Sequence, residues 1–120
     1  MAIYAALTYT RDVDWSAPEQ AELMVEYKQF GNDHRDQIHG GEVLYPTGTA
    51  TTIRVVGARG GDVVTTDGPY AETKEALTGF YLIDAEDLDE AIRIASEMPA
   101  AWDGAVELRP VVRQWADRPS

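Results

Sequence analysis

The 120-residue sequence predicts an α+β fold in which strands and helices follow the order β-α-β-β-α-β. Runs of β-branched, aromatic and aliphatic residues lie at both ends of the chain and at 77–84. Two segments between these runs carry apolar residues at helical spacing. Two such helices cover only one face of a four-stranded sheet, so the pattern predicts a ferredoxin-like sandwich with one open face and an extra hairpin.

The first helix is expected to follow a strand at 2–10. It begins with a capping box, in which Ser16 is the N-cap and Glu19 follows three residues later. Its apolar face has a spacing of three or four residues and consists of Leu23, Tyr27, Phe30, His34 and Ile38. Two consecutive glycines, Gly40 and Gly41, are expected to end it.

The middle of the chain predicts a loop at 42–49 and then a hairpin. Residues 51–56 are mostly β-branched, 62–66 is a second β-like run, and glycines lie between them. The hairpin leads into the turn Asp67-Gly68-Pro69-Tyr70. An aspartate can hydrogen-bond the backbone two residues on, a glycine can take positive φ, and a proline fixes its own φ.

The second half of the chain predicts a strand, a helix and a last strand. The strand at 77–84 has the strongest signal, and the helix begins with a second capping box formed by Asp87 and Glu90. The predicted buried stripe of this helix consists of Leu88, Ala91, Ile92, Ala95 and Met98, and Pro99 follows it. The last strand, 106–113, alternates apolar and charged residues.

The composition narrows the classes of function. With 21 acidic and 10 basic residues the chain has a net charge of −11, which disfavours binding to nucleic acid or to an anionic membrane. The absence of cysteine excludes disulfides and thiolate metal sites. The N-terminus lacks the basic start of a signal peptide, and no apolar run is long enough to span a membrane. We therefore expect one soluble, cytoplasmic domain without a cofactor.

Two residues are candidates for catalysis. Asp67 is either a general base at the mouth of a cleft or a turn residue whose oxygens bind backbone N–H groups. His34 lies on the apolar face of the first helix, and we expect it to be partly buried close to the sheet. Its acidic and histidine neighbours, Asp33, Asp36 and His39, have no spacing that matches a known metal site, so no metal is predicted.

Four further residues are candidates for binding a ligand. Tyr70, Glu72 and Lys74 follow the turn, where such a charged cluster is either a binding site or a solvated surface. Arg109 either anchors an anionic ligand or pairs with Glu107 at an interface, since the two side chains share one face of a strand. Tyr4, Tyr27, Tyr81 and the three tryptophans supply apolar surface for a small-molecule pocket or for the core.

Several of these segments together resemble the YCII-related proteins, in particular the branch named after its Asp-Gly-Pro-Phe motif. The resemblance is carried by the run from Thr66 to Glu75, by 79–83, by 87–91 and by the ending 106–111. It implies a dimeric α/β-barrel, ferredoxin-like in each subunit, with a cleft between sheet and helices. Related proteins are thought to use a His–Asp pair whose histidine lies near the start of the first helix, where this sequence reads Pro-Glu-Gln-Ala-Glu-Leu from residue 18.

Two hypotheses follow for the function. In the first, the protein is a homodimer that binds a small molecule, or acts on one without a metal, in a cleft near Asp67 and His34. In the second, it is an interaction module linked to an extracytoplasmic-function sigma factor, because genes of the branch often lie beside such factors. The acidic surface would suit a basic partner.

Overall fold

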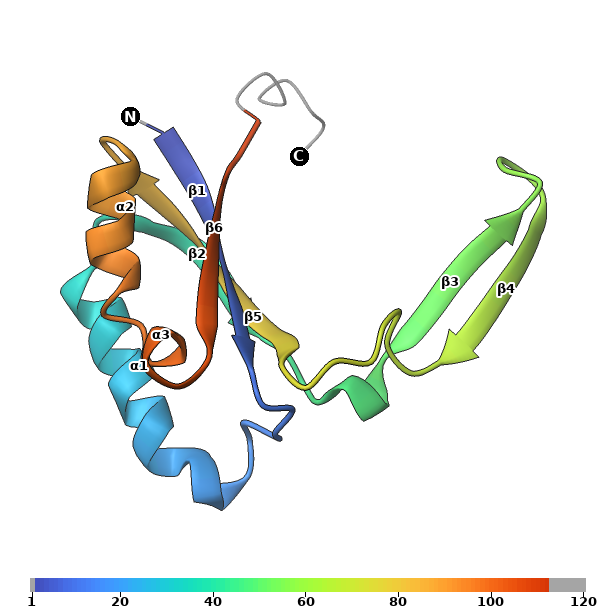
Figure 1. Cartoon of the computed structure of the whole chain (residues 1–120), viewed down its shortest axis with the longest axis horizontal. Coiled ribbons are helices and arrows are strands. Elements are labelled where there is room, and N and C mark those ends of the chain that lie inside the picture. Colours follow the sequence, from blue (N-terminus) through green and yellow to red (C-terminus); the bar gives the residue numbers. More distant parts are fainter. Residues whose placement is uncertain (1, 113–120) are drawn as a thin grey trace.

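The fold is an antiparallel sheet with its helices on one side, as the computed structural model of residues 2–112 shows (Figure 1). Its four strands, in the spatial order β2-β5-β1-β6, are Ile38–Val43 (β2), Ala76–Ala85 (β5), Ala2–Thr10 (β1) and Ala105–Pro110 (β6). The helices α1 (Ala21–Asp33), α2 (Leu88–Ala95) and α3 (Pro99–Asp103) lie on one face. The predicted α+β class is confirmed, and the topology is compatible with a ferredoxin-like fold.

The core lies between this sheet and its helices. Strand β1 is buried at every second residue, as expected for a strand with one covered face, and Ala6 is completely inaccessible. Ile83 from β5 and Ile94 from α2 meet in the same cluster, together with Phe30 from α1 and Met98. Val106 and Leu108 also pack against this core, so Glu107 and Arg109 lie on the opposite, open side of β6.

The first helix is shorter than predicted and begins differently. A 3-10 turn (η1, Pro18–Gln20) precedes α1, and its N-cap is Ala17. Ser16 is no cap, because its hydroxyl and its N–H both donate to the Asp14 carboxylate, at 2.6 and 2.9 Å. The helix ends at Asp33, since the N–H of His34 donates to the Phe30 carbonyl and the chain then turns.

The segment after α1 is the edge strand β2, where the sequence pattern predicted the end of a helix. Ile38 continues the helical spacing in the sequence but pairs with Ile83 of β5. Gly40 and Gly41 do not end a helix, and the predicted loop at 42–49 begins inside this strand. A Cβ atom on Gly41 would lie 2.5 Å from the Phe80 carbonyl oxygen, so the glycine is required by the close approach of two strands.

The second helix has the predicted cap but a different buried face. The N–H of Glu90 donates to the Asp87 carboxylate at 2.9 Å, which confirms Asp87 as N-cap. Ala91, Ile94 and Ala95 are buried, whereas Leu88 and Ile92 are exposed. The predicted stripe is confirmed at Ala91, Ala95 and Met98 and was wrong at Leu88 and Ile92. Pro99 does follow the helix and begins α3. The predicted last strand reached Arg113, which lies outside the described residues.

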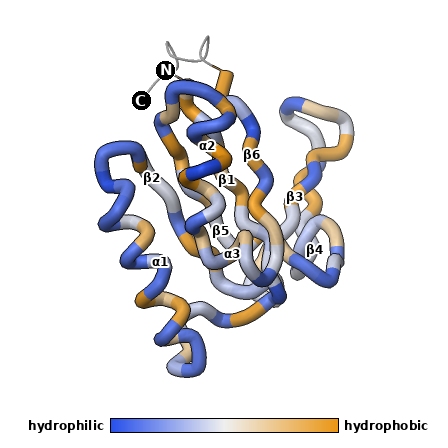
Figure 2. The backbone as a smooth tube through the Cα atoms, turned by 60° about the vertical axis from the view of Figure 1, so that its left-hand side comes forward, coloured by the Kyte–Doolittle hydropathy of each residue, from blue (hydrophilic) through white to orange (hydrophobic). Residues whose placement is uncertain are grey.

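Strands β3 (Thr51–Val56) and β4 (Asp62–Asp67) pair with each other in a separate two-stranded sheet. Figure 1 shows this pair, which we call the arm, projecting from the four-stranded sheet on the side away from the helices. The arm raises the radius of gyration to 16.4 Å, where about 14 Å is expected for a compact chain of this length. Its apolar residues include Ile53, Val55 and Val63, all exposed, and Figure 2 shows hydrophobic stretches in the arm.

Candidate functional site

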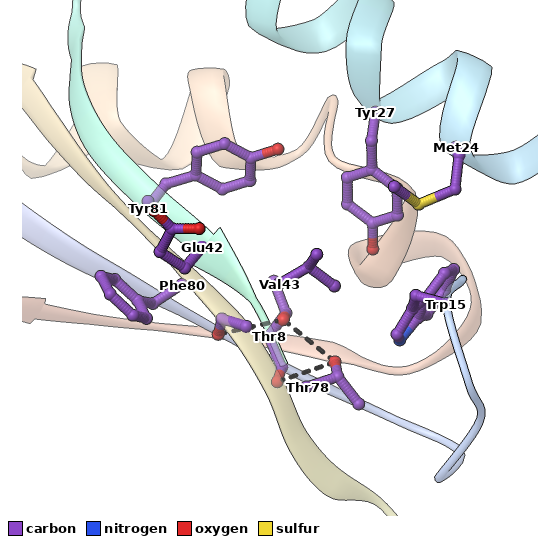
Figure 3. Close-up of a pocket in the computed structure, with 11 residues that line it drawn as sticks. Thr8, Trp15, Met24, Tyr27, Glu42, Val43, Thr78, Phe80 and Tyr81 are labelled. Atoms are coloured by element: carbon purple, nitrogen blue, oxygen red, sulfur yellow. Dashed lines mark hydrogen bonds between the residues drawn. The ribbon is translucent and has the colours of Figure 1, made fainter. Parts of the chain in front are cut away.

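A cavity of about 260 Å³ lies between α1 and the sheet, at the end where β2 and β5 pair. Its walls are mainly aromatic and aliphatic side chains, with two threonines on the sheet (Figure 3). The lining residues labelled in that view are Thr8, Trp15, Met24, Tyr27, Glu42, Val43, Thr78, Phe80 and Tyr81. Glu42 and Phe80 pair with each other, and the strand register places their side chains on the other face of the sheet. Such a mixture of apolar walls and a few convergent polar groups is typical of small-molecule sites.

The threonines on the sheet satisfy one another and the backbone. The hydroxyl oxygens of Thr8 and Thr78 are 3.1 Å apart, and Thr10 donates to Thr78 at 3.3 Å. Thr8 also donates to the Gly79 carbonyl at 3.1 Å. All three side chains are buried, and this network holds the two strands in register below the cavity.

The aromatic side chains form a rigid wall opposite the threonines. The rings of Trp15 and Tyr27 meet edge to face, with their centroids 5.7 Å apart, and Tyr81 contacts Phe30 in the same manner at 5.2 Å. Burial raises the pKa of Tyr27 to about 12, with a smaller contribution from the nearby Tyr81, and burial also raises the pKa of Tyr81. Both phenols are protonated at neutral pH, as an unperturbed tyrosine already is, and each hydroxyl can donate a hydrogen bond.

One polar atom on this wall has no partner. The indole Nε1 of Trp15 is buried and makes no hydrogen bond with the part of the chain that the structure describes. The Trp15 side chain is only 8% exposed, so solvent reaches little of it. Buried donors without partners are rare in folded proteins, which singles out this atom.

Comparison with known proteins places the chain. The family model of the YCII-related domain matches residues 3–115. The chain belongs to the YCII-related family. An uncharacterized protein of Rhizobium meliloti is 35% identical over an alignment of 119 residues that covers 91% of this chain and 91% of that protein. The name of this relative states no activity.

In this YCII-related protein, His34 lies outside the cavity wall. It follows the end of α1, where its ring packs on Phe30 with a centroid distance of 5.0 Å. Its Nε2 atom is 2.9 Å from Oε1 of Glu97, a residue just after α2. This contact ties the ends of two helices together. Within residues 2–112, no three histidine, aspartate or glutamate side chains gather where they could hold a metal ion.

The other candidates of this YCII-related protein lie on the surface. Asp67 is exposed at the end of β4, and Glu72 and Lys74 are exposed beyond it. Tyr70 is 77% exposed and lies under the guanidinium of Arg54, 5.2 Å from the ring centroid. Arg109 lies on the open side of β6. None of the six predicted site residues is among those that line the cavity, and their roles remain predictions.

Sequence reasoning found some of the cavity and missed the rest. Tyr27, Tyr81 and the tryptophans were proposed as pocket lining, and Trp15 does line the cavity. Trp102 lies on the surface, and Trp115 lies outside the described residues. The missed signal was the placement of Thr8 and Thr78, the two threonines that line the cavity, within apolar strands. Such polar residues on the buried side of a strand need partners.

Hydrogen bonds of the backbone and of Thr52 hold the turn after the arm. The hypothesis that the Asp67 carboxylate holds this turn was wrong. The N–H of Gly68 donates to the Ala50 carbonyl at 2.8 Å, and the Thr52 hydroxyl donates to the Gly68 carbonyl at 2.9 Å. Gly68 has a φ of +106°, a conformation that side chains disfavour. Among the described residues, nothing hydrogen-bonds to the Asp67 side chain. The turn therefore depends on Gly68.

We expect Gly68→Ala to lower the free energy of unfolding by about 1 kcal/mol or more, because alanine is strained at this positive φ. Asp67→Ala should change it by less than about 0.5 kcal/mol, as is usual for an exposed side chain without partners. Urea unfolding of the two variants and the parent measures both values. If Asp67→Ala lowers the free energy of unfolding as much as Gly68→Ala does, the Asp67 carboxylate does stabilise the turn.

No helix within the described part of the chain is both long enough and apolar enough to cross a membrane.

Proposed function

We propose that this protein binds a small organic molecule in the cavity between α1 and the sheet. The observation that carries the proposal is the cavity itself: about 260 Å³, walled by Trp15, Tyr27, Tyr81 and other apolar side chains. Its volume lies just below the usual range of ligand sites, which is about 300–1,000 Å³. The ligand is therefore small, with one or two rings.

The chemistry of the wall supports binding more than catalysis. The described side chains that could transfer a proton at the cavity are the phenols of Tyr27 and Tyr81. A general acid or base works best with a pKa near the working pH. The pKa values of both phenols are raised further away from neutrality. We therefore propose a binding protein, with metal-independent catalysis as the second reading of the same cavity.

Filling the cavity tests this proposal. Met24 lines the cavity from α1, and Val25, the next residue, is 65% exposed. We expect small aromatic compounds to raise the melting temperature of the parent protein, because they bind only the native state. Met24→Trp should abolish this rise, because the larger ring occupies the ligand's space, and Val25→Trp should keep it.

A thermal-shift screen of small aromatic compounds against the three proteins provides the measurement. Compounds that stabilise all three equally bind elsewhere. If no compound in the screen stabilises the parent, the proposal of a small-molecule site fails. The unliganded melting temperatures of Met24→Trp and Val25→Trp serve as the control for folding.

We propose in addition that the protein is a homodimer packed through the open face of its sheet. Across that face, β1 places Leu7 between Phe80 and Glu107, and Ala5 between Leu82 and Arg109. All the helices of the described chain lie on the other face, so this row of half-exposed apolar side chains lacks a cover. A two-fold axis through the face would bring the Glu107 and Arg109 of each subunit near those of the other.

We further propose membership in the Asp-Gly-Pro-Phe branch, which the motif Asp67-Gly68-Pro69-Tyr70 supports with tyrosine in the last place. A regulatory role beside an extracytoplasmic-function sigma factor is the alternative function. The exposed apolar arm is the feature of this structure that would suit a protein partner. The proposed dimer uses the open face of the four-stranded sheet and leaves the arm for such a partner.

A further inference from the structure

We infer that the arm packs on the second copy of this chain, through the face that carries Ile53, Val55 and Val63. The inference rests on the proposed homodimer, because it adds a second surface to the same contact. Three features of the described residues carry it: an arm fixed at its base and held away from its own sheet, one apolar face without a cover, and a charge that suits an acidic partner.

Hydrogen bonds fix the arm at its base. The N–H and the hydroxyl of Thr47 both donate to the Asp12 carboxylate, which ties the 3-10 turn before β3 (η2, Thr47–Thr49) to the segment after β1. The hydrogen bonds of the Gly68 turn fix the end of β4. Beyond this base, β3 and β4 pair only with each other. The arm is therefore presented outward in one direction, as expected of a segment that contacts another molecule.

One face of the arm is apolar and has no cover. Val55 pairs with Val63, and Ile53 lies two residues before Val55, so the three side chains share this face. Its one charged residue, Asp67, lies at the base of the arm. All three apolar side chains are exposed, and Val63 is 67% exposed. A two-stranded hairpin is marginally stable in water by itself, so this face needs a partner surface.

The opposite face of the arm is more polar and has a contact of its own. Arg54 and Asp62 lie on it, together with Val56 and Val64. The guanidinium of Arg54 lies over the ring of Tyr70, 5.2 Å from its centroid. The chain itself therefore contributes to covering this face, and the face of Ile53, Val55 and Val63 is the one left for a second molecule.

The charge of the arm favours an acidic partner over a basic one. The arm is neutral as a whole, with Arg54 and Arg59 against Asp62 and Asp67, so the net charge of −11 lies on the rest of the chain. Beyond Asp67 at its base, the arm is positive by one charge. The alternative function would give the arm to a basic partner, for which this charge is unsuited. A second copy of this acidic chain offers a complementary surface.

The second copy is also within reach of the arm. Figure 1 shows the arm and the four-stranded sheet diverging from a common base, on the side of the sheet that has no helices. A copy that packs on the open face, as in the proposed dimer, therefore lies beside the arm. Two-fold symmetry makes the contact twice, because the arm of each copy reaches the other.

Two neighbouring valines on opposite faces of β4 provide the test. Val63 and Val64 are 67% and 45% exposed, so neither substitution disturbs the core, and Val63→Glu and Val64→Glu change the charge of the arm equally. We expect Val63→Glu to raise the dissociation constant of the dimer at least about tenfold, because its carboxylate would lose solvation in the contact. Val64→Glu, the matched control, should raise it less than about threefold. Sedimentation velocity over a dilution series measures both constants.

Thiol labelling provides a second readout, because the chain has no cysteine of its own. The thiol of Val63→Cys should react with a maleimide at least about tenfold more slowly in the dimer than in a sample diluted far below the dissociation constant, since dilution uncovers the apolar face by mass action. The thiol of Val64→Cys should react at the same rate in both samples.

The outcomes separate the arm from the dimer itself. If the parent is a dimer and Val63→Glu dimerises as tightly, or if the Val63→Cys thiol reacts equally fast in both samples, the arm lies outside the contact and the inference fails while the dimer stands. Equal weakening by Val63→Glu and Val64→Glu would overturn the choice of face. A parent that is monomeric at every concentration would refute the proposed dimer and the inference together.

Discussion

Leu7→Glu is expected to convert the proposed homodimer into a monomer. Leu7 lies in the middle strand of the open face, beside Phe80 on one side and Glu107 on the other. In a two-fold dimer the new carboxylate would be buried in both subunits without a partner, and a buried unpaired charge costs about 3–5 kcal/mol. The dissociation constant should therefore rise at least about a hundredfold, since each factor of ten corresponds to about 1.4 kcal/mol.

Sedimentation velocity at micromolar concentration measures this change. The control is Val25→Glu, which adds the same charge to an exposed position on α1, away from the open face. It should leave the dimer intact. A parent protein that sediments as a monomer would refute the dimer, and a Leu7→Glu protein that stays dimeric would place the interface elsewhere.

Ile94→Ala is expected to cause the largest loss of stability of any single change considered for this chain. Ile94 is 1% exposed and lies in the main core cluster, so its truncation leaves a cavity and should cost about 3–4 kcal/mol. Ile92→Ala removes the same atoms from the same helix, two residues earlier, where the side chain is 50% exposed. That change should cost less than about 1 kcal/mol.

Thermal and urea unfolding of both variants provide the comparison. A larger loss at Ile92 than at Ile94 would mean that α2 packs with the face that its sequence spacing first predicted. The control for secondary structure is the helical circular dichroism of the folded variants, because both substitutions place alanine, a good helix former, in the same helix.

The two helices show what sequence patterns can and cannot determine. The cap of α2 was predictable because Asp87 and Glu90 act through local hydrogen bonds. Its buried face was less predictable: apolar residues surround much of this short helix, and Ala91, Ile92, Ile94 and Ala95 fit more than one stripe. The choice between stripes is made by the sheet, since Ile94 and Ala95 join the cluster of Ile83 and Phe30 while Ile92 is exposed.

The sequence pattern did not predict the edge strand β2, for a related reason. Ile38 follows His34 at helical spacing, and Gly40-Gly41 is typical of a helix end, so the local signals agree on the wrong element. The deciding interaction is tertiary: the backbone of Gly41 lies so close to Phe80 and Tyr81 that a side chain would collide with them. A contact between residues so far apart in sequence leaves no mark in the sequence spacing.

The residues of the candidate site were likewise only partly predictable from the sequence. The predicted site included four residues that cluster in the sequence: Asp67, Tyr70, Glu72 and Lys74. The fold leaves all four on the surface. The cavity is built from single residues of distant segments, such as Trp15, Val43 and Thr78. Aromatic content could indicate that a pocket was feasible, but only the packing of α1 over β2 and β5 brings these residues together.

The position of β1 in the sheet has a consequence for synthesis of the chain. Residues 2–10 are synthesised well before their partners, β5 at 76–85 and β6 at 105–110. The nascent N-terminal strand therefore stays unpaired while the arm, whose strands are separated by five residues, can already form. The apolar side chains of β1 are exposed throughout this interval, so the time taken to translate about a hundred residues, at about 5–20 per second, sets the minimum period during which the chain is open to aggregation.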